Sequence, residues 1–468
     1  LLWTLLLLIP VLIVNQEMVV RLGLVTGVGH ARLIIERFGK FWGAFSVGDL
    51  FVLNFLTIVT EFIGVSLGMQ YFGVSPYLSV PGASVALIVF VASGSFRHWE
   101  RWMYLCVAVS LLTIPLAFFG HPALGPVLHG SVVPGVQGGL DSTALLLIIA
   151  IVGTTVAPWQ LFFQQSNVID KRLTPRWMAY ERADLSLGAL LVIAGAAALM
   201  IATAFAFRGT KLAGTFVDAG QVAGGLRAYA GPIAGAVAAI VLINAGIIGA
   251  SAVTLSSAYA FGDLFKVRHS LHRSFGQAKG FYVTYALSVL AAAAIVLIPN
   301  APLGLLTEAV QALAGVLLPS AIVFLLLLCN DKDVLGPWVN RPWLNAVASA
   351  IVGVLVMLSL ILAATTFFPS VNAKALTAGL AIILVLGLSA IGLLHLRRRH
   401  AAGEIDPVLL ADKATWRMPP LAELTRPAWS MTRTVGMYTL RGYLLLAVIL
   451  LIAKVVALAI SGQGAGAG

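Results

Sequence analysis

Residues 153–170 read Gly-Thr-Thr-Val-Ala-Pro-Trp-Gln-Leu-Phe-Phe-Gln-Gln-Ser-Asn-Val-Ile-Asp and interrupt a long apolar run of the chain. Pro158 has no backbone N–H, and its ring clashes with the carbonyl four residues earlier, so a regular helix is disturbed there. This frees carbonyl groups near Gly153, Thr154 and Thr155, as in the discontinuous helices that coordinate ions in secondary transporters. A simple proline kink in a membrane helix is the alternative interpretation of the same motif.

The composition around this motif is that of a membrane protein. The chain has 468 residues, of which 60% are hydrophobic and 10% are charged. A soluble globular chain carries about 25% charged residues, so an ordinary soluble enzyme, a nucleic-acid-binding domain and a disordered chain are excluded. The cysteines, Cys106 and Cys329, each lie inside an apolar run, which excludes a disulfide framework.

The apolar runs are long enough to be transmembrane helices. A spanning helix needs about 20 mostly apolar residues, and the runs lack the alternating pattern of a membrane β-barrel. We therefore predict an all-α polytopic membrane protein. The expected spans are residues 1–20, 47–72, 78–96, 102–119, 143–168, 185–207, 229–262, 280–299, 304–328, 345–366, 376–396 and 439–461.

Basic residues are distributed unevenly over the connecting loops. Most of the 29 Lys and Arg residues fall in alternate loops, and the loops between those hold only Arg208, Lys211, Arg227 and Lys374. Cytoplasmic loops carry the excess of Lys and Arg, so we expect an integral protein of a bacterial-type inner (plasma) membrane with its basic loops cytoplasmic. Leu1 then lies on the outer side, and we expect a preceding span that the chain as given lacks.

The chain divides into a transporter core and a short C-terminal part. We predict a core over residues 1–396, a basic cytoplasmic segment over 397–438, and an additional transmembrane helix with its tail over 439–468. The chain contains no Gly-x-x-x-x-Gly-Lys-Ser/Thr motif, which argues against ATP-driven pumping.

Polar side chains inside apolar spans are candidates for function because burying them in a membrane is expensive. Glu61 lies in mid-span and could relay a proton or an ion, or could serve as a structural hydrogen-bonding group. Glu308 and Gln311 share one helical face. Asn244 is interpreted as a contact between helices.

Four segments, in this order, resemble the NRAMP family of divalent-metal transporters, which has a LeuT-type inverted-repeat fold with discontinuous helices. They are Leu1–Gly27, Thr60–Gly64, Gly153–Pro158 and Cys329–Asn345, and the resemblance extends to about residue 396. It implies that Leu1 begins the second helix of the family. The first helix of the family, with an Asp and an Asn that bind metal, would then be missing from this chain.

The resemblance also implies roles for single residues. Thr154, through its carbonyl, and Gln311 would contact the ion or its waters. Ala157 occupies the position of a methionine ligand in the family. Trp159 replaces a histidine and Ile58 replaces an acidic residue, both of which belong to the proton route of the family. The broken-helix motif would comprise Gly153, Thr155, Pro158 and Trp159, together with the metal-site positions Thr154 and Ala157.

These departures define the expected function. A thioether favours transition metals, whereas Mg²⁺ prefers oxygen ligands and retains several waters. The pattern resembles the NRAMP-related magnesium transporters, so we expect a secondary transporter of hydrated Mg²⁺, and also Mn²⁺, without proton coupling. The alternatives are a proton-coupled Mn²⁺/Fe²⁺ symporter, which would need Glu61 to titrate, and an organic-solute carrier on the same fold. We expect no enzymatic activity and no cofactor. The expected partners are the divalent metal ion and the lipid bilayer, nucleic acid is excluded, and the sequence leaves the oligomeric state open.

Overall fold

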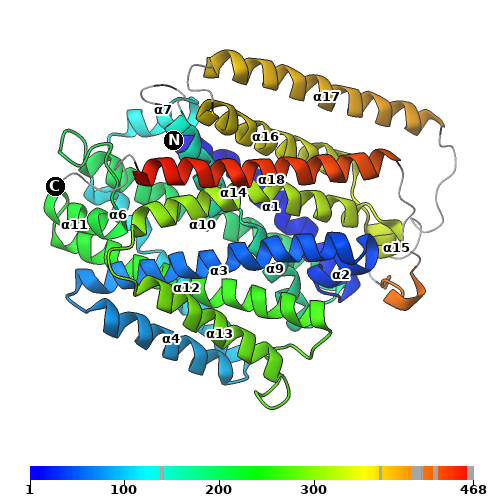
Figure 1. The fold of residues 1–468 in the computed structure, drawn as a ribbon, viewed down its shortest axis with the longest axis horizontal. Helices are drawn as coiled ribbons and strands as arrows, with labels where there is room; N and C mark the ends of the chain where they lie inside the picture. Colours follow the sequence, from blue (N-terminus) through cyan, green and yellow to red (C-terminus); the bar gives the residue numbers. More distant parts are fainter. Residues whose placement is uncertain are drawn as a thin grey trace.

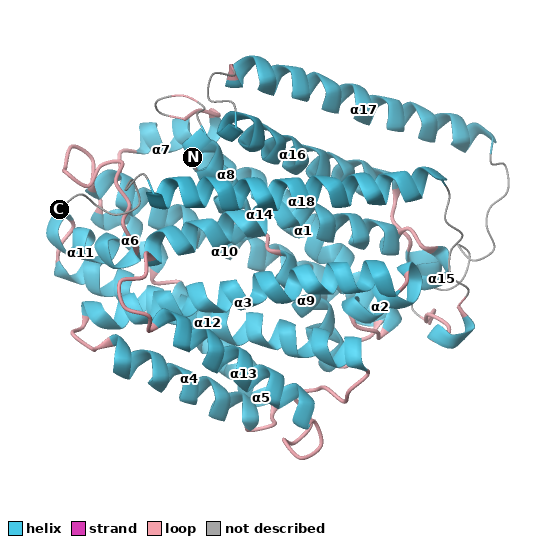
Figure 2. Cartoon of the chain, in the orientation of Figure 1, coloured by secondary structure: helices cyan, strands magenta, loops and turns pink. Residues whose placement is uncertain are grey.

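The computed structural model consists of helices joined by turns and loops, and the residues that it describes contain no β-strand (Figures 1 and 2). It describes residues 1–136, 139, 142–367, 372–401, 413, 415–424 and 431–460. Most of the long helices lie side by side along one common direction (Figure 1). This arrangement is the one expected for a chain whose helices cross a bilayer.

The helices of the first part of the chain are α1 (Leu2–Thr26), α2 (His30–Phe38), α3 (Lys40–Tyr71), α4 (Pro76–Ala92), α5 (Phe96–Ser110), α6 (Thr113–Phe119), α7 (Leu124–Val132), α8 (Ser142–Thr155) and α9 (Pro158–Asp170). The helices that follow are η1 (Pro175–Trp177), α10 (Met178–Ala206), α11 (Ala219–Tyr229), α12 (Pro232–Phe265), α13 (Lys279–Val296), α14 (Leu303–Cys329), α15 (Lys332–Leu335), η2 (Gly336–Trp338), α16 (Pro342–Phe367), α17 (Ala373–Ala401), η4 (Leu421–Glu423) and α18 (Met431–Ile460).

The predicted apolar runs all fall on helices of the structure. Among the described residues, nine helical segments are long and apolar enough to cross a membrane. The α4 helix has 17 residues and is shorter than these segments. The α3 helix begins at Lys40, before the predicted start at residue 47, because the helix continues beyond the apolar part of its sequence.

Small residues let α3 and α12 approach each other closely. A Cβ atom at Gly246 of α12 would overlap the backbone oxygen of Glu61, and one at Gly68 of α3 would crowd the backbone oxygen of Ala239. Helix pairs in membranes associate mainly by such close packing. A buried hydrogen bond of 3.0 Å, from Asn54 Nδ2 to Ser257 Oγ, adds a polar contact between the two helices.

An ion-pair cluster joins the elements at one end of the bundle. The buried Arg37 of α2 donates from Nε to Asp331 at 2.7 Å, and its Nη2 lies 3.0 Å from Asp333. We call this end of the bundle the basic end; it comprises α2, α15 and residues 413 and 415–424. The helices α2 and α15 lie at the right of Figure 1. At this end, Trp338 donates a hydrogen bond of 2.8 Å from Nε1 to the backbone carbonyl of Lys413.

The C-terminal part of the chain differs in its helix bounds from the predicted segments. The α17 helix continues to Ala401 and α18 begins at Met431, so both helices extend into the predicted segment 397–438. Residues 402–412, 414 and 425–430 of that segment, and residues 461–468 of the tail, lie outside the described part of the chain.

Candidate functional site at the broken helix

The apolar segment that contains residues 153–170 is divided into two helices. The α8 helix ends at Thr155 and α9 begins at Pro158, with Ala157 between them in an extended conformation (φ −97°, ψ 148°). Proline suits the first position of a helix because its missing N–H would be unpaired there in any case. The structure therefore has a discontinuous helix at this motif, and the interpretation as a simple kink is wrong.

The side chain of Gln160 spans the interruption. Its Nε2 donates to the Thr155 carbonyl at 3.3 Å, and its Oε1 accepts a hydrogen bond of 3.3 Å from the Ala157 N–H. In a bilayer the backbone groups released by a break must find partners within the protein. Gln160 supplies two of these partners. The sequence analysis did not identify this residue, although a glutamine at the third helical position is part of a capping-box pattern.

The break is held close to α14 at Gly153. A Cβ atom at Gly153 would overlap the backbone oxygen of Gln311 and the backbone nitrogen of Gly315. Gly315 in turn leaves no room for a Cβ because the Ile149 carbonyl lies against it. The structure thus brings the backbones of Gly153 and Gln311 into close contact, and the role of Gln311 at the ion stays a prediction.

The remaining residues of the motif have different surroundings. Thr154 is exposed, whereas Ala157 is 3% exposed. Thr155 is buried and donates from its hydroxyl to the Ile151 carbonyl at 2.7 Å. The carbonyl of Trp159 accepts a hydrogen bond of 3.1 Å from the Ser256 hydroxyl of α12, which ties the start of α9 to a neighbouring helix.

A small cavity lies against the first turn of α9. Its volume is about 20 Å³, enough for about one water molecule. Its polar lining comes from Asp49 and Ser46 of α3 and from Ser320 of α14, beside Pro158 and Phe162. All three polar side chains offer oxygen atoms, which are the ligands that Mg²⁺ and Ca²⁺ prefer.

Asp49 was missed by the sequence analysis. It lies within the predicted span 47–72, so the rule that picks out intramembrane carboxyl groups could have found it. Its nearness to the broken helix depends on the packing of α3 against α9 and α14, which the sequence of α3 does not contain.

The last described helix, α18, lies beside this cavity. The positive charge of Arg441 acts on Asp49, and the guanidinium lies 4.5 Å from the centre of the Phe41 ring. Leu444, one turn further along α18, is buried in an apolar cluster with Leu53 and Leu317, which also line the cavity. The α18 helix therefore packs against residues that line the cavity.

Glu61 is placed apart from the break. Its carboxyl group lies against Gly249 of α12, where a Cβ atom would overlap it. On α12, Gly249 lies seven residues before Ser256, the residue that bonds to Trp159 at the break. Seven residues span about 10 Å of helix, at a rise of 1.5 Å per residue. Within the described part of the chain, Glu61 has no hydrogen-bonded or ionic partner. The structure therefore separates Glu61 from the residues of the break.

The carboxylate at the other end of α9 is fully engaged. Asp170 accepts hydrogen bonds from the Tyr259 hydroxyl at 2.6 Å, the Ser270 hydroxyl at 2.5 Å and the Leu271 N–H at 2.8 Å. These bonds tie the end of α9 to α12 and to the loop that follows it. Asp170 therefore has a structural role, in contrast to Asp49.

No group of three or more His, Cys, Asp and Glu side chains suited to a metal ion occurs among the described residues.

We expect Gly153→Ala to destabilise the protein, because the added methyl group would push α8 away from α14. Overpacking of a close contact costs typically 1–3 kcal/mol, and the melting temperature in detergent should fall. Gly188→Ala is the matched control, since a Cβ atom at Gly188 of α10 meets nothing within 4 Å. Equal melting temperatures for the two variants would contradict the close α8–α14 contact.

Comparison with known proteins identifies the family. The family model described as "Natural resistance-associated macrophage protein-like" (Nramp) matches residues 1–365. The divalent metal cation transporter MntH of Latilactobacillus sakei is 26% identical over 373 residues, covering 74% of this chain and 78% of that protein. MntH of Bacillus subtilis is 25% identical over 397 residues, covering 78% of this chain and 85% of that protein.

A solved structure shows the same fold. The manganese transporter of Eremococcus coleocola, in complex with an aromatic bis-isothiourea substituted compound, superimposes with a TM-score of 0.59 at 18% identity, covering 85% of this chain and 88% of that chain. The relatives described here are named for divalent metal cations or manganese, so they do not support the expected placement in the magnesium branch. The architecture is that of a LeuT-type transporter, and the chain belongs to the Nramp family.

Proposed function

We propose that this protein is a secondary transporter of divalent cations and that its site favours hydrated Mg²⁺, with Mn²⁺ also accepted. The observation that carries the proposal is the broken helix between α8 and α9, with Ala157 buried at the interruption. The cavity beside it offers carboxylate and hydroxyl oxygens from Asp49, Ser46 and Ser320. Oxygen ligands without sulfur favour Mg²⁺ and Mn²⁺ over softer transition metals.

The absence of a sulfur ligand at residue 157 is the basis for the ion preference. The family carries a methionine at the position that Ala157 occupies in this chain. Alanine is smaller and leaves space that a hydrated ion can use. Mg²⁺ gives up its water molecules reluctantly and usually keeps several of them when bound. Thr154, through its carbonyl, and Gln311 are proposed to contact these waters.

We further propose that transport is not coupled to protons. Trp159 and Ile58 occupy positions where the family carries titratable groups, and Ile58 is fully buried among apolar neighbours. Glu61 keeps its carboxyl group, but it lies about two helical turns from the break, against Gly249. This separation supports a structural role for Glu61.

A proton-coupled Mn²⁺ carrier is the second candidate. It is favoured by the names of the relatives, which include manganese transporters. In this mechanism Glu61 would carry the proton, because it is the mid-span carboxyl group for which the described structure provides no partner.

The natural full-length protein in liposomes distinguishes the two candidates. We expect Mg²⁺ to enter the vesicles, as followed with a Mg²⁺-sensitive dye, while a pH dye in the lumen records no acidification. Protein-free vesicles and vesicles treated with a divalent-cation ionophore set the limits of the signal. Mn²⁺ entry that acidifies the lumen, with no Mg²⁺ entry, would overturn the proposal in favour of the proton-coupled carrier.

The variant Ala157→Met tests the ion preference. A thioether at the break should raise the ratio of Mn²⁺ or Cd²⁺ to Mg²⁺ transport by about tenfold, which corresponds to about 1.4 kcal/mol. Competition between the ions in the same vesicles measures this ratio. Ala183→Met, at an exposed position of α10, is the control, and an unchanged ratio in Ala157→Met would remove the argument from sulfur.

Two carboxyl variants test the separation of Glu61 from the ion site. Glu61→Gln should leave Mg²⁺ flux largely intact because it lies away from the break. Asp49→Asn should lower the flux by about tenfold, or about 1.4 kcal/mol, because it removes the negative charge beside the cavity. A folded Glu61→Gln protein without flux, next to an active Asp49→Asn protein, would reverse the assignment.

A further inference from the structure

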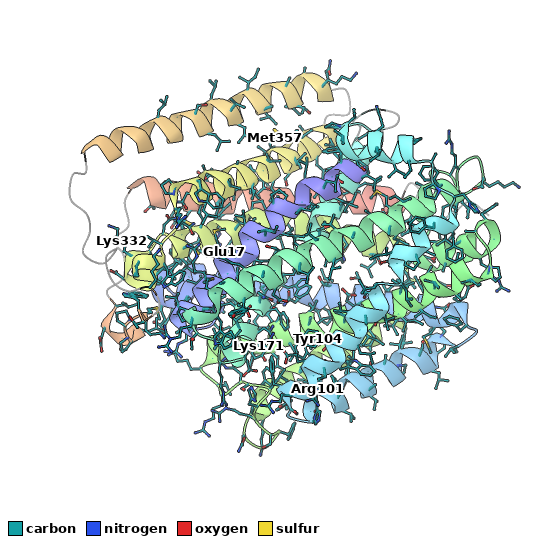
Figure 3. All side chains as sticks on the ribbon, turned by 180° about the vertical axis from the view of Figure 1, so that it is seen from behind. Glu17, Arg101, Tyr104, Lys171, Lys332 and Met357 are labelled. Carbon is teal, nitrogen blue, oxygen red and sulfur yellow. The ribbon has the colours of Figure 1, made fainter. Side chains whose placement is uncertain are left out.

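A second and much larger cavity is lined in part by Lys413 of the basic end and shares no lining residue with the first. Its volume is about 490 Å³, within the usual range for sites that hold small molecules. Its walls come from α1, α10, the start of α16 and the segment around Trp338, and Lys413 contributes to its lining. One of the lining residues, Glu17 of α1, lies in the half of the bundle that also contains Lys332 of α15 (Figure 3).

The lining is strongly basic. Four of its side chains carry a positive charge and one carries a negative charge: Arg21, Arg182, Arg341, Lys413 and Glu17. The single carboxylate is shared between two of the guanidinium groups. Glu17 lies 2.7 Å from Nη2 of Arg182 and 3.3 Å from Nη2 of Arg21. The other two cations are therefore left without a counter-charge from the lining.

Arg341 and Lys413 are the two uncompensated cations. Within the described part of the chain, neither side chain has an acidic partner. The ammonium of Lys413 lies 5.5 Å from the centre of the Trp338 ring. Burial, and then the positive charges of Arg341, Arg21 and Arg182, lower the pKa of Lys413. The contribution of the three arginines to this lowering reflects repulsion between like charges, which an anion in the cavity would relieve.

The cavity is polar at one end and apolar at the other. Ile13 and Val14 come about one turn before Glu17 on α1, on the side away from the basic end. Leu185 follows Arg182 by three residues on α10, and Leu344 follows Arg341 by three residues on α16. Each helix therefore leads from charged side chains at the basic end to apolar side chains toward the middle of the bundle.

Two tryptophans are also part of the lining. Trp338 and Trp343 both line the cavity, and Trp343 is exposed at the start of α16. Tryptophan is enriched where the bilayer meets water because its ring is apolar and its N–H is polar. The cavity is thus lined by residues of the kind that occur where a bilayer meets water.

We propose that this cavity binds an anionic phospholipid, with its phosphate between Arg341 and Lys413 and its acyl chains along Ile13, Val14 and Leu185. A free phosphate would be satisfied by the basic part alone and would leave the apolar part of the cavity unused. A zwitterionic lipid would bring a positive charge into a lining that already carries an excess of them. Basic pockets between transmembrane helices are known to take the headgroups of anionic lipids.

Native mass spectrometry of the full-length protein, titrated in non-ionic detergent with 1-palmitoyl-2-oleoyl phosphatidylglycerol, tests this assignment. We expect one retained phosphatidylglycerol per protein and much weaker retention of the matching phosphatidylcholine. The double variant R341Q/K413Q should bind phosphatidylglycerol at least roughly tenfold more weakly, because each basic residue contributes about 1 kcal/mol to such binding. Equal binding of the two lipids by the unmodified protein would overturn the proposal.

A matched charge control is available on α5. The variant R97Q/R101Q removes the same charge from two exposed positions outside the cavity, and it should retain phosphatidylglycerol like the unmodified protein. If both double variants lose the lipid equally, the binding reflects overall charge and the cavity is not the site.

A steric pair keeps the proposal testable if the charge variant fails to fold. Ser186→Trp fills the cavity without changing its charge and should abolish retention, whereas Leu187→Trp, on the exposed face of α10, should not. Retention by Ser186→Trp would contradict the proposal. In a further arm, sn-glycerol 3-phosphate is added without lipid. Binding as tight as that of phosphatidylglycerol, with the same loss in R341Q/K413Q, would identify a soluble phosphate ester as the ligand and overturn the lipid assignment.

Discussion

The rest of the candidate site depends on how the chain satisfies its backbone at Pro158. A helix interrupted in a membrane releases polar groups that water cannot reach. Here Gln160 bonds to Thr155 on one side of the break and to Ala157 on the other. The Thr155 carbonyl and the Ala157 N–H are thus satisfied by a side chain of the protein itself.

The close contact at Gly153 complements this arrangement by fixing the position of the first half-helix. The α8 helix lies against α14 at a distance that only glycine permits, and the start of α9 is attached separately to α12 through Ser256. The two halves of the broken helix are thus bound to different neighbours. A relative movement of α14 and α12 would change the angle at the break, as the rocking of one repeat against the other requires in transporters of this architecture.

The spans and the break could be predicted from the sequence because both are local. Apolar length and a mid-span proline are read from neighbouring residues, and the structure places helices at all the predicted runs. The roles of Asp49 and Gln160 were missed for different reasons. Asp49 becomes part of the site only through the packing of α3 on α9 and α14. Gln160 follows a capping-box pattern, but the pattern was not recognised as a helix start because it lies inside an apolar segment. The contact of Arg441 with the Phe41 ring of α3 joins residues 400 positions apart in the chain, and no local pattern carries that information.

The position of α18 has a consequence for the order in which this protein is built. Domains and helices emerge from the ribosome in chain order, so α3 and α14 are made well before α18. Until α18 arrives, the surface around Asp49 lacks Arg441, and the apolar cluster lacks Leu444. A carboxylate within a membrane segment is costly to keep without a nearby cation. The insertion of α18 thus brings Arg441 and Leu444 to this region only after α3 and α14 have been made.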